Sequence, residues 1–284
     1  MPERPDLEYV VPKLQRALKG QRVGLVDLRN PVVLRQMAPG TPQALLEGAT
    51  VQAIKRRAHF VHFGLDGPVD VVVSPMLAGR FALLEAPTKG RIRKDVALRV
   101  GFEALELRYR DDVQMGKVYL CPREQLKEIP GFAKIGVNVL GKAFTVDKLQ
   151  ALAAKERRQV KLFLMDKSKL DAMGNAYADE VLFAAGIHPK ARVSELSPEQ
   201  VTALHAAIVK VLGDARSEIR RRKPALDEKL RDFLAVRNRK GEPCPVCGTA
   251  IRAAGVRGHD AFFCPRCQPD AKGRGFVDWS RVPR

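Results

Sequence analysis

The chain has 284 residues, of which 45% are hydrophobic and 29% are charged, and this balance excludes wholesale disorder. No run of about 18 apolar residues occurs, so the sequence predicts no transmembrane helix. The 50 Lys and Arg residues outnumber the 32 Asp and Glu residues, giving a formal charge of +18. Such a charge favours nucleic acid as partner, because neutralised phosphates release counterions, although ribosomal and membrane-surface proteins share it.

Residues 1–132 read mainly as β-structure. One helix is predicted over 11–19, with Pro12 in its first turn and Gly20 at its end. Short β-branched or aromatic runs then alternate with turn residues, which predicts a β-sandwich or barrel rather than a βαβ array. The predicted strands are 51–54, 60–65, 69–73, 96–100, 105–109 and 117–120.

The pattern becomes helical near residue 145, after a Gly-rich linker over 129–144. Thr145 is a good N-cap for a helix over 146–158, whose apolar residues recur every three or four positions. Further helices are predicted over 160–165, 175–185, 197–212 and 225–236. The chain is therefore expected to be an α+β multidomain protein, with a helical domain over 145–236 and a small cysteine-containing domain over 237–284.

Four cysteines in the last domain have the spacing of a zinc site: Cys244-x2-Cys247-x16-Cys264-x2-Cys267. Two CxxC turns can place four thiolates tetrahedrally, which predicts one structural Zn²⁺ without an open catalytic position. The remaining Cys121 is predicted to be a buried apolar residue. Between the two CxxC turns (the zinc knuckles), a hairpin is predicted over 251–263. Its Arg257 and His259 could contact DNA phosphates or a groove, or the hairpin could simply be a solvated loop.

The N-terminus offers a nucleophile if Met1 is removed. Pro2 would then carry a secondary α-amine, and such amines have a pKa of about 7.7–8.0, well below the roughly 10.4 of Lys. The unprotonated fraction can attack a carbonyl carbon, with Glu3 as acid or base. By itself, a chain that begins with Pro-Glu after Met1 is weak evidence for this chemistry.

Three stretches resemble one family. Residues 160–189 contain Val160-Lys161-Leu162-Phe163-Leu164-Met165-Asp166-Lys167 and Gly174-Asn175-Ala176-Tyr177-Ala178-Asp179-Glu180, and Gly174-Asn175 opens a helix whose free N–H groups can hold a phosphate. Residues 239–249 read Arg-Lys-Gly-Glu-Pro-Cys-Pro-Val-Cys-Gly-Thr, and residues 2–8 read Pro-Glu-Arg-Pro-Asp-Leu-Glu. Together they resemble the formamidopyrimidine-DNA glycosylase / endonuclease VIII family over nearly the whole chain.

The resemblance implies an N-terminal β-sandwich, a helix–two-turn–helix domain and a C-terminal zinc finger. It also implies removal of a damaged base followed by strand cleavage at the abasic site. Base flipping costs a few kcal/mol, so a wedge and a phosphate clamp are needed. On the family pattern, Pro2 is the Schiff-base nucleophile, Glu3 the acid/base, Asn175 a phosphate ligand, Lys161 a neighbour of the extruded base and Met76 the wedge.

The sequence departs from the family at the clamp. His59 stands where the family has a phosphate-binding Lys, and His259 stands where the finger offers an Arg. The void-filling loop reads Asp111-Asp112-Val113-Gln114-Met115-Gly116 and lacks the family's Arg and Phe. Nearby arginines, Arg257 among them, could compensate; alternatively, the two histidines could make phosphate binding sensitive to pH.

The leading hypothesis is therefore a bifunctional DNA glycosylase and abasic-site lyase of base excision repair. The alternative is a weakly or non-catalytic DNA-binding protein of the same fold that recognises abasic, crosslinked or otherwise unusual DNA. A zinc-containing RNA-binding protein would share the charge but would leave the N-terminus unexplained. The expected partner is damaged DNA, with no membrane, and we expect a monomer in a bacterial-type cytoplasm, associated with the nucleoid.

Overall fold

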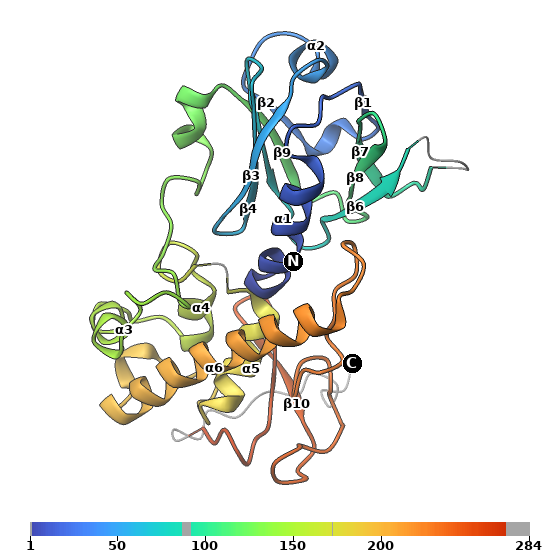
Figure 1. Ribbon diagram of the computed structural model, residues 1–284. Helices are drawn as coiled ribbons and strands as arrows, with labels where there is room; N and C mark the ends of the chain where they lie inside the picture. The colour runs from blue at the N-terminus through green and yellow to red at the C-terminus, as the bar shows by residue number, and fades with distance from the viewer. Residues whose placement is uncertain (1, 87–91, 172, 271–284) are drawn as a thin grey trace, which may run out of the picture. The chain divides into compact units, whose positions relative to one another are not determined.

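The computed structural model describes residues 2–86, 92–171 and 173–270 (Figure 1). The chain divides into two compact units: unit 1 comprises Met1–Ile135 and Arg216–Leu230, and unit 2 comprises Gly136–Ala215 and Arg231–Arg284. The domain boundaries that the sequence predicts, 1–132, 145–236 and 237–284, stay predictions. Within the described ranges, no helix is both long and apolar enough to cross a bilayer.

Unit 1 contains two β-sheets, and all their strands except β5 are labelled in Figure 1. The first has the order β2 (Leu34–Gln36), β9 (Lys117–Cys121), β5 (Asp70–Ser74), β4 (Phe60–Leu65), β3 (Val51–Arg57). The second has the order β1 (Leu25–Leu28), β7 (Val96–Gly101), β8 (Leu105–Arg110), β6 (Arg80–Glu85). Of the described pairs, β2–β9 is parallel and the others are antiparallel.

The two sheets pack face to face, which confirms the predicted sandwich. The rings of Phe63 on β4 and Phe81 on β6 have centroids 6.0 Å apart, and valines and leucines of both sheets line the space around them. Strands β1, β2 and β6 are missing from the sequence prediction. The first two are very short, and β6 contains the Ala-Leu-Leu run that is equally good in a helix.

Helix α1 (Arg4–Leu18) begins seven residues before the predicted start at residue 11, so that prediction is wrong about the N-terminus. Glu3 is the N-cap, and its backbone N–H donates to the Asp6 carboxylate at 2.7 Å. Pro12 lies inside the helix rather than in its first turn. A proline there removes one helical hydrogen bond, and the burial of Leu7, Leu14 and Leu18 offsets that cost. Unit 1 also contains α2 (Pro42–Leu46), η1 (Pro31–Val33) and η2 (Arg123–Glu128).

Unit 2 is helical and has an apolar core formed by α3 (Val146–Ala153), α4 (Val160–Met165), α5 (Asn175–Ala184) and the first part of α6 (Pro198–Arg222), with η3 (Val193–Glu195) between them. Helix α6 runs ten residues beyond the predicted end at 212, because Ala215 and Ile219 continue its buried stripe. From Arg216 onward it belongs to unit 1.

The helix predicted over 225–236 is absent, and the segment is irregular. The carboxylate of Glu180 on α5 accepts the backbone N–H groups of Ala235, Val236 and Arg237 at 2.6–3.0 Å. Those groups would otherwise bond to carbonyls four residues earlier in a helix. A long-range side-chain contact therefore takes the N–H groups at the end of the predicted helix.

The predicted hairpin of the finger is confirmed as β10 (Arg252–Val256) and β11 (His259–Phe263). Its two turn residues, Arg257 and Gly258, have φ of 43° and 83°. Positive φ at both central positions is the hairpin turn that matches the twist of the strands. The turn places Arg257 and His259 at the exposed tip.

Candidate catalytic and nucleic-acid-binding site

Pro2 is buried in unit 1 and lines a small cavity of about 20 Å³. The other lining residues come from α1, from β6 and the residue before it, and from the segment 226–229. Such a space holds about one water-sized group, so a nucleotide can reach Pro2 only if part of the lining moves. Met1 lies outside the described residues, and its removal stays a prediction.

Segment 224–229 is tied to the rest of unit 1 at three points. The Tyr9 hydroxyl donates to the carbonyl of Pro224 at 2.8 Å, and Arg110 pairs with Asp227. The Lys229 ammonium donates to the carbonyl of Leu77 at 3.2 Å. These contacts hold Leu226, Glu228 and Lys229 in the wall of the Pro2 cavity.

Glu3, the predicted acid/base, is almost fully buried at the start of α1. Its carboxylate and that of Asp6 form the capping box of the helix, so Glu3 already has a structural task. Capping fixes the position of the carboxyl group next to Pro2. The structure thus brings both predicted catalytic residues to one helix start.

Met76, the predicted wedge, lies in the turn between β5 and β6 with a φ of 46°. This left-handed conformation costs a non-glycine residue about 1 kcal/mol or more. The turn is tight, because a Cβ on Gly79 would lie 2.3 Å from both the Pro75 carbonyl and the Tyr109 hydroxyl. Met76 is half-buried, whereas the adjacent Leu77 is 56% exposed and was missed by the sequence reasoning.

The loop between β8 and β9 carries two more exposed apolar side chains that sequence reasoning missed. The carboxylate of Asp111 accepts the backbone N–H groups of Val113, Gln114 and Gly116 at 2.6–3.3 Å, which fixes the loop. Val113 is 51% exposed and Met115 is 44% exposed. Their signal in the sequence was an apolar residue at every second position of a polar turn.

His59 lies at the turn between β3 and β4, and its ring centroid is 4.0 Å from that of Phe60. The arginines before it are engaged within unit 1. The Arg57 guanidinium donates to the carbonyl of Phe132 at 2.8 Å and covers its ring, and Arg56 donates to the carbonyl of Ala58 at 2.7 Å. Either arginine would have to give up these contacts to replace the family's phosphate-binding Lys.

Lys161 is fully buried in unit 2, and its ammonium donates to the Asp179 carboxylate and to the carbonyl of Asp260. Burial lowers the pKa of Lys161 and raises the pKa of Asp179, and the attraction between the two opposes both shifts. The guanidinium of Arg237 donates to the same Asp179 carboxylate at 2.9 Å. In this arrangement Lys161 supports the interior of unit 2 rather than facing an extruded base.

Asn175 is the first residue of α5, as the resemblance requires of a phosphate ligand. Its side-chain amide donates to the carboxylate of Asp260, and the Arg237 guanidinium donates to the same carboxylate at 2.9 and 3.2 Å. Sequence reasoning missed both Arg237 and Asp260. Neither has a local motif, because Asp260 is 85 residues from Asn175 along the chain.

The finger tip contributes Arg257 to a basic hollow of about 450 Å³ in unit 2. The other lining residues are Arg157, Arg158, Gln159, Leu162, Lys190 and Arg192. Arg158 is neutralised by Glu156 and Asp166, at 2.5 and 2.7 Å. His259 is exposed at the start of β11, on the same hairpin. The basic side chains that line the hollow give it the charge that attracts a phosphodiester strand.

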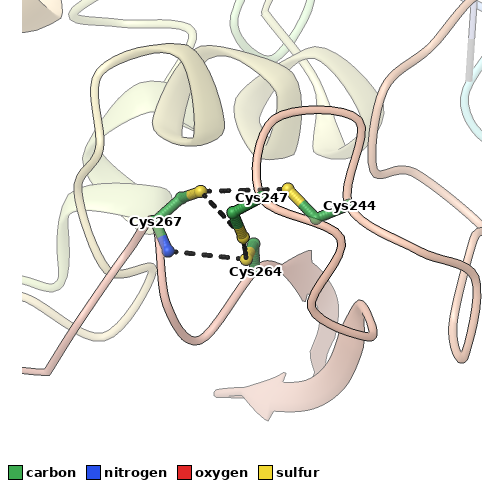
Figure 2. A group of neighbouring side chains, drawn as sticks. All are labelled: Cys244, Cys247, Cys264 and Cys267. Carbon is green, nitrogen blue, oxygen red and sulfur yellow. Dashed lines mark hydrogen bonds between the residues drawn. The ribbon is translucent and has the colours of Figure 1, made fainter.

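The four cysteine sulfurs point toward one another (Figure 2) and lie within 4.8 Å of one another. The Sγ–Sγ distance is 3.8 Å between Cys244 and Cys267, and it is 3.5 Å from Cys247 to both Cys264 and Cys267. Thiolates at about 2.3 Å from a tetrahedral zinc ion lie about 3.8 Å apart, so the cluster has the right size. Burial and neighbouring sulfurs raise the pKa of Cys267 to about 12, which a divalent cation would reverse. The cluster fits one structural Zn²⁺.

The knuckles are anchored to the helical core of unit 2. The buried Gln268 amide donates to the carbonyl of Ile187 at 2.9 Å and accepts the N–H of Cys264 at 3.0 Å. Val236, Ile251 and Phe183 pack around the cysteines. Zinc binding therefore also fixes the finger on α5.

Comparison with known families covers most of the chain. Residues 1–118 match the formamidopyrimidine-DNA glycosylase N-terminal domain, and residues 135–222 match the H2TH domain of the same enzyme. Residues 241–269 match a zinc finger found in FPG and IleRS.

Several curated relatives match nearly end to end. A formamidopyrimidine-DNA glycosylase of Symbiobacterium thermophilum is 34% identical, over 96% of this chain and 91% of its own length. That of Bacillus subtilis is 33% identical, over 94% and 99%. Among solved structures, the Lactococcus lactis Fpg in complex with DNA containing an abasic site is 26% identical, with a TM-score of 0.83 over 94% of this chain and 100% of that one. The Thermus thermophilus MutM (Fpg) protein is 28% identical, with a TM-score of 0.79 over 94% and 98%.

Proposed function

This chain belongs to the formamidopyrimidine-DNA glycosylase family, and we propose that it is a DNA glycosylase of base excision repair with abasic-site lyase activity. The single observation that carries the proposal is the start of α1. Pro2 lines a cavity there, and Glu3 caps the same helix. The match of residues 1–118 to the family's N-terminal domain supports it.

The proposed reaction begins with the α-amine of Pro2, freed by loss of Met1. The amine attacks C1′ of the damaged nucleotide, the glycosidic bond breaks, and the base leaves with a proton delivered from an acid. Opening of the sugar gives a covalent iminium between Pro2 and C1′. Loss of a C2′ proton then breaks the bond from C3′ to the phosphate oxygen and cuts the strand. Glu3 is the proposed group for the proton transfers.

DNA is the proposed partner, because the similar Lactococcus lactis Fpg forms complexes with DNA. We assign phosphate contacts to Asn175, His59, His259 and the basic hollow that includes Arg257. The space left by a flipped nucleotide needs an apolar filler. Met76 and its neighbour Leu77 on one turn, and Val113 and Met115 on the β8–β9 loop, are the candidates, because the last three are half exposed.

The second candidate function is a DNA-binding protein of this fold without the chemistry. His59 and His259 favour it, since they replace two permanently charged clamp residues of the family pattern. Each charged hydrogen bond is worth roughly 1.5–3 kcal/mol, so the loss of both would weaken lesion binding by about two to four decades.

Cleavage of a duplex that contains one abasic site distinguishes the two functions. The full-length wild-type protein is expected to nick the strand, and Pro2→Gly is expected to lose at least a hundredfold in rate while it still binds the duplex. Arg16→Ala, at an exposed position of the same helix, is the control and should leave the rate unchanged. Tight binding without nicking, by wild-type protein whose mass lacks Met1, would support the DNA-binding protein instead.

A further inference from the structure

Two donors in unit 2 converge on one anionic oxygen. The Asn175 amide and the Arg237 guanidinium, the latter at 3.2 Å, both donate to Oδ1 of Asp260. Arg237 also reaches Oδ2 of the same carboxylate at 2.9 Å. An amide and a guanidinium on one carboxylate oxygen form an anion-binding pair whose occupant comes from the protein itself.

The two donors are held in place by their surroundings. Arg237 donates with its other terminal nitrogen to the buried Asp179 at 2.9 Å, and its guanidinium lies 4.9 Å from the centre of the Phe262 ring. Asn175 opens α5, a helix of ten residues, so free backbone N–H groups add positive potential beside it. Within the described residues, Oδ1 of Asn175 has no hydrogen-bond partner, and the bond to Asp260 orients the amide.

The occupant is held less firmly than the donors. The side chain of Asp260 is 53% exposed, whereas that of Arg237 is 14% exposed. The carboxylate can therefore rotate into water without a change in the backbone, whose carbonyl stays bound to Lys161. A phosphodiester carries the same single negative charge as the carboxylate that it would replace, and its non-bridging oxygens accept hydrogen bonds from the same donors.

We propose that Asn175 and Arg237 together form a DNA phosphate site, and that the Asp260 carboxylate occupies this site in the free protein and competes with the phosphate. This inference rests on the proposed function for its ligand, a phosphodiester of bound DNA. Arg237 is then a phosphate-binding residue that compensates in part for the histidines at 59 and 259. Asp260 lowers the affinity for every DNA, because a phosphate can bind to Asn175 and Arg237 only after it displaces the Asp260 carboxylate.

The test compares Asp260→Asn with wild type in the affinity of the full, zinc-loaded chain for two 20-base-pair duplexes, one undamaged and one containing a tetrahydrofuran abasic analogue. Removing the competing charge is expected to tighten binding of both duplexes about tenfold at fixed salt. Asn175→Ala in the Asp260→Asn background is expected to cancel most of the gain. Asp270→Asn, a substitution of another acidic residue with the same change in net charge, is the matched control and should change affinity less than twofold.

Arg237 is tested by replacement with Gln and with Lys, with thermal unfolding recorded for each because Arg237 also pairs with Asp179. Arg237→Gln is expected to weaken binding about tenfold. It is also expected to reduce the steepness of log affinity against log salt by about the amount that one phosphate contact contributes. Arg237→Lys keeps the positive charge and is expected to restore the slope. Unchanged affinity in folded Asp260→Asn would overturn the inference, and would make the Asp260 contacts a purely structural tie.

The outcomes separate this inference from the proposed function. A gain in affinity by Asp260→Asn without any cleavage of abasic DNA supports the phosphate site and contradicts the lyase. Cleavage by wild type without a gain in Asp260→Asn supports the lyase and contradicts the competing carboxylate.

Discussion

The two compact units place their buried charges differently. In unit 1 the space between the sheets is lined by Val, Leu, Phe and Tyr side chains, and buried carboxylates such as Glu3 and Asp111 accept backbone N–H groups of a helix start and of a loop. In unit 2 Lys161, Asp179 and Glu180 are buried and connect α4, α5 and the segment that leads to the finger. A buried charge is costly without its partner, so unit 2 depends on its finger in a way that the sandwich of unit 1 does not.

Loss of zinc should produce the largest difference between the units. Binding of a structural zinc contributes on the order of 10 kcal/mol to folding of a small finger, so chelation is expected to unfold residues 241–269. Amide hydrogen exchange should show protection lost in the finger and retained in the strands of unit 1. Cys264→Ser should reproduce the effect with no bound zinc, whereas Cys121→Ser, in a strand of unit 1, should keep one zinc ion per chain. Equal loss of protection in both units would contradict the claim that only unit 2 depends on the finger.

Removing one member of the buried pair should have the next largest effect. Lys161→Met leaves Asp179 with one partner fewer in the interior and is expected to destabilise the protein by about 3–5 kcal/mol. Arg93→Ala, which breaks an exposed pair in unit 1, is expected to cost less than about 0.5 kcal/mol. Urea unfolding followed by circular dichroism measures both, and a cost below about 1 kcal/mol for Lys161→Met would be inconsistent with this account.

Two carboxylates that each accept three backbone N–H groups sharpen the comparison. Glu180→Gln is expected to cost about 2 kcal/mol, because the segment 235–237 loses its charged acceptor inside unit 2. Asp111→Asn in unit 1 is expected to cost about 1 kcal/mol and to loosen only the loop 111–116. Hydrogen exchange of the segment and of the loop reads the two effects separately. A larger loss of stability for Asp111→Asn than for Glu180→Gln would contradict the greater dependence of unit 2 on its buried carboxylate.

The smallest predicted effect is on acid stability. Hydrogen bonds from Arg158 lower the pKa of Glu156 in unit 2 to about 2. Because the folded-state pKa is depressed, the stabilisation is complete above the ordinary pKa of Glu and disappears as the pH falls from about 4.5 toward 2. Glu156→Gln should remove about 1 kcal/mol at pH 7 and flatten this part of the stability curve, since Arg158 is partly exposed. A curve of unchanged slope would contradict the prediction.

Local patterns predicted the helices of unit 2 well where the chain itself marks their ends. Helix α4 matches its predicted range, and α5 ends one residue before the prediction, because Gly174 and Gly186 bracket it. At the end of the mispredicted 225–236 segment, Glu180, far away along the chain, takes the N–H groups of Ala235 and Val236. No local pattern could have indicated that contact.

The candidate site divides in the same way. Pro2, Glu3, Asn175 and the zinc cysteines stand in recognisable motifs and were predicted by residue. Arg237 and Asp260 acquire a role only when the finger hairpin packs on α5, so no local motif marks either residue. The exposed Leu77, Val113 and Met115 depend on turns whose backbone conformation is set by contacts with Tyr109 and Asp111.

The most direct test of the proposed chemistry is reductive trapping. Borohydride is added to the wild-type protein with an abasic-site duplex, and the covalent product is digested and mapped by mass spectrometry. We expect an adduct on the N-terminal peptide, at the nitrogen of Pro2, from protein that lacks Met1. An adduct on a lysine, or none from protein that binds the duplex and lacks Met1, would contradict a role for Pro2 as nucleophile.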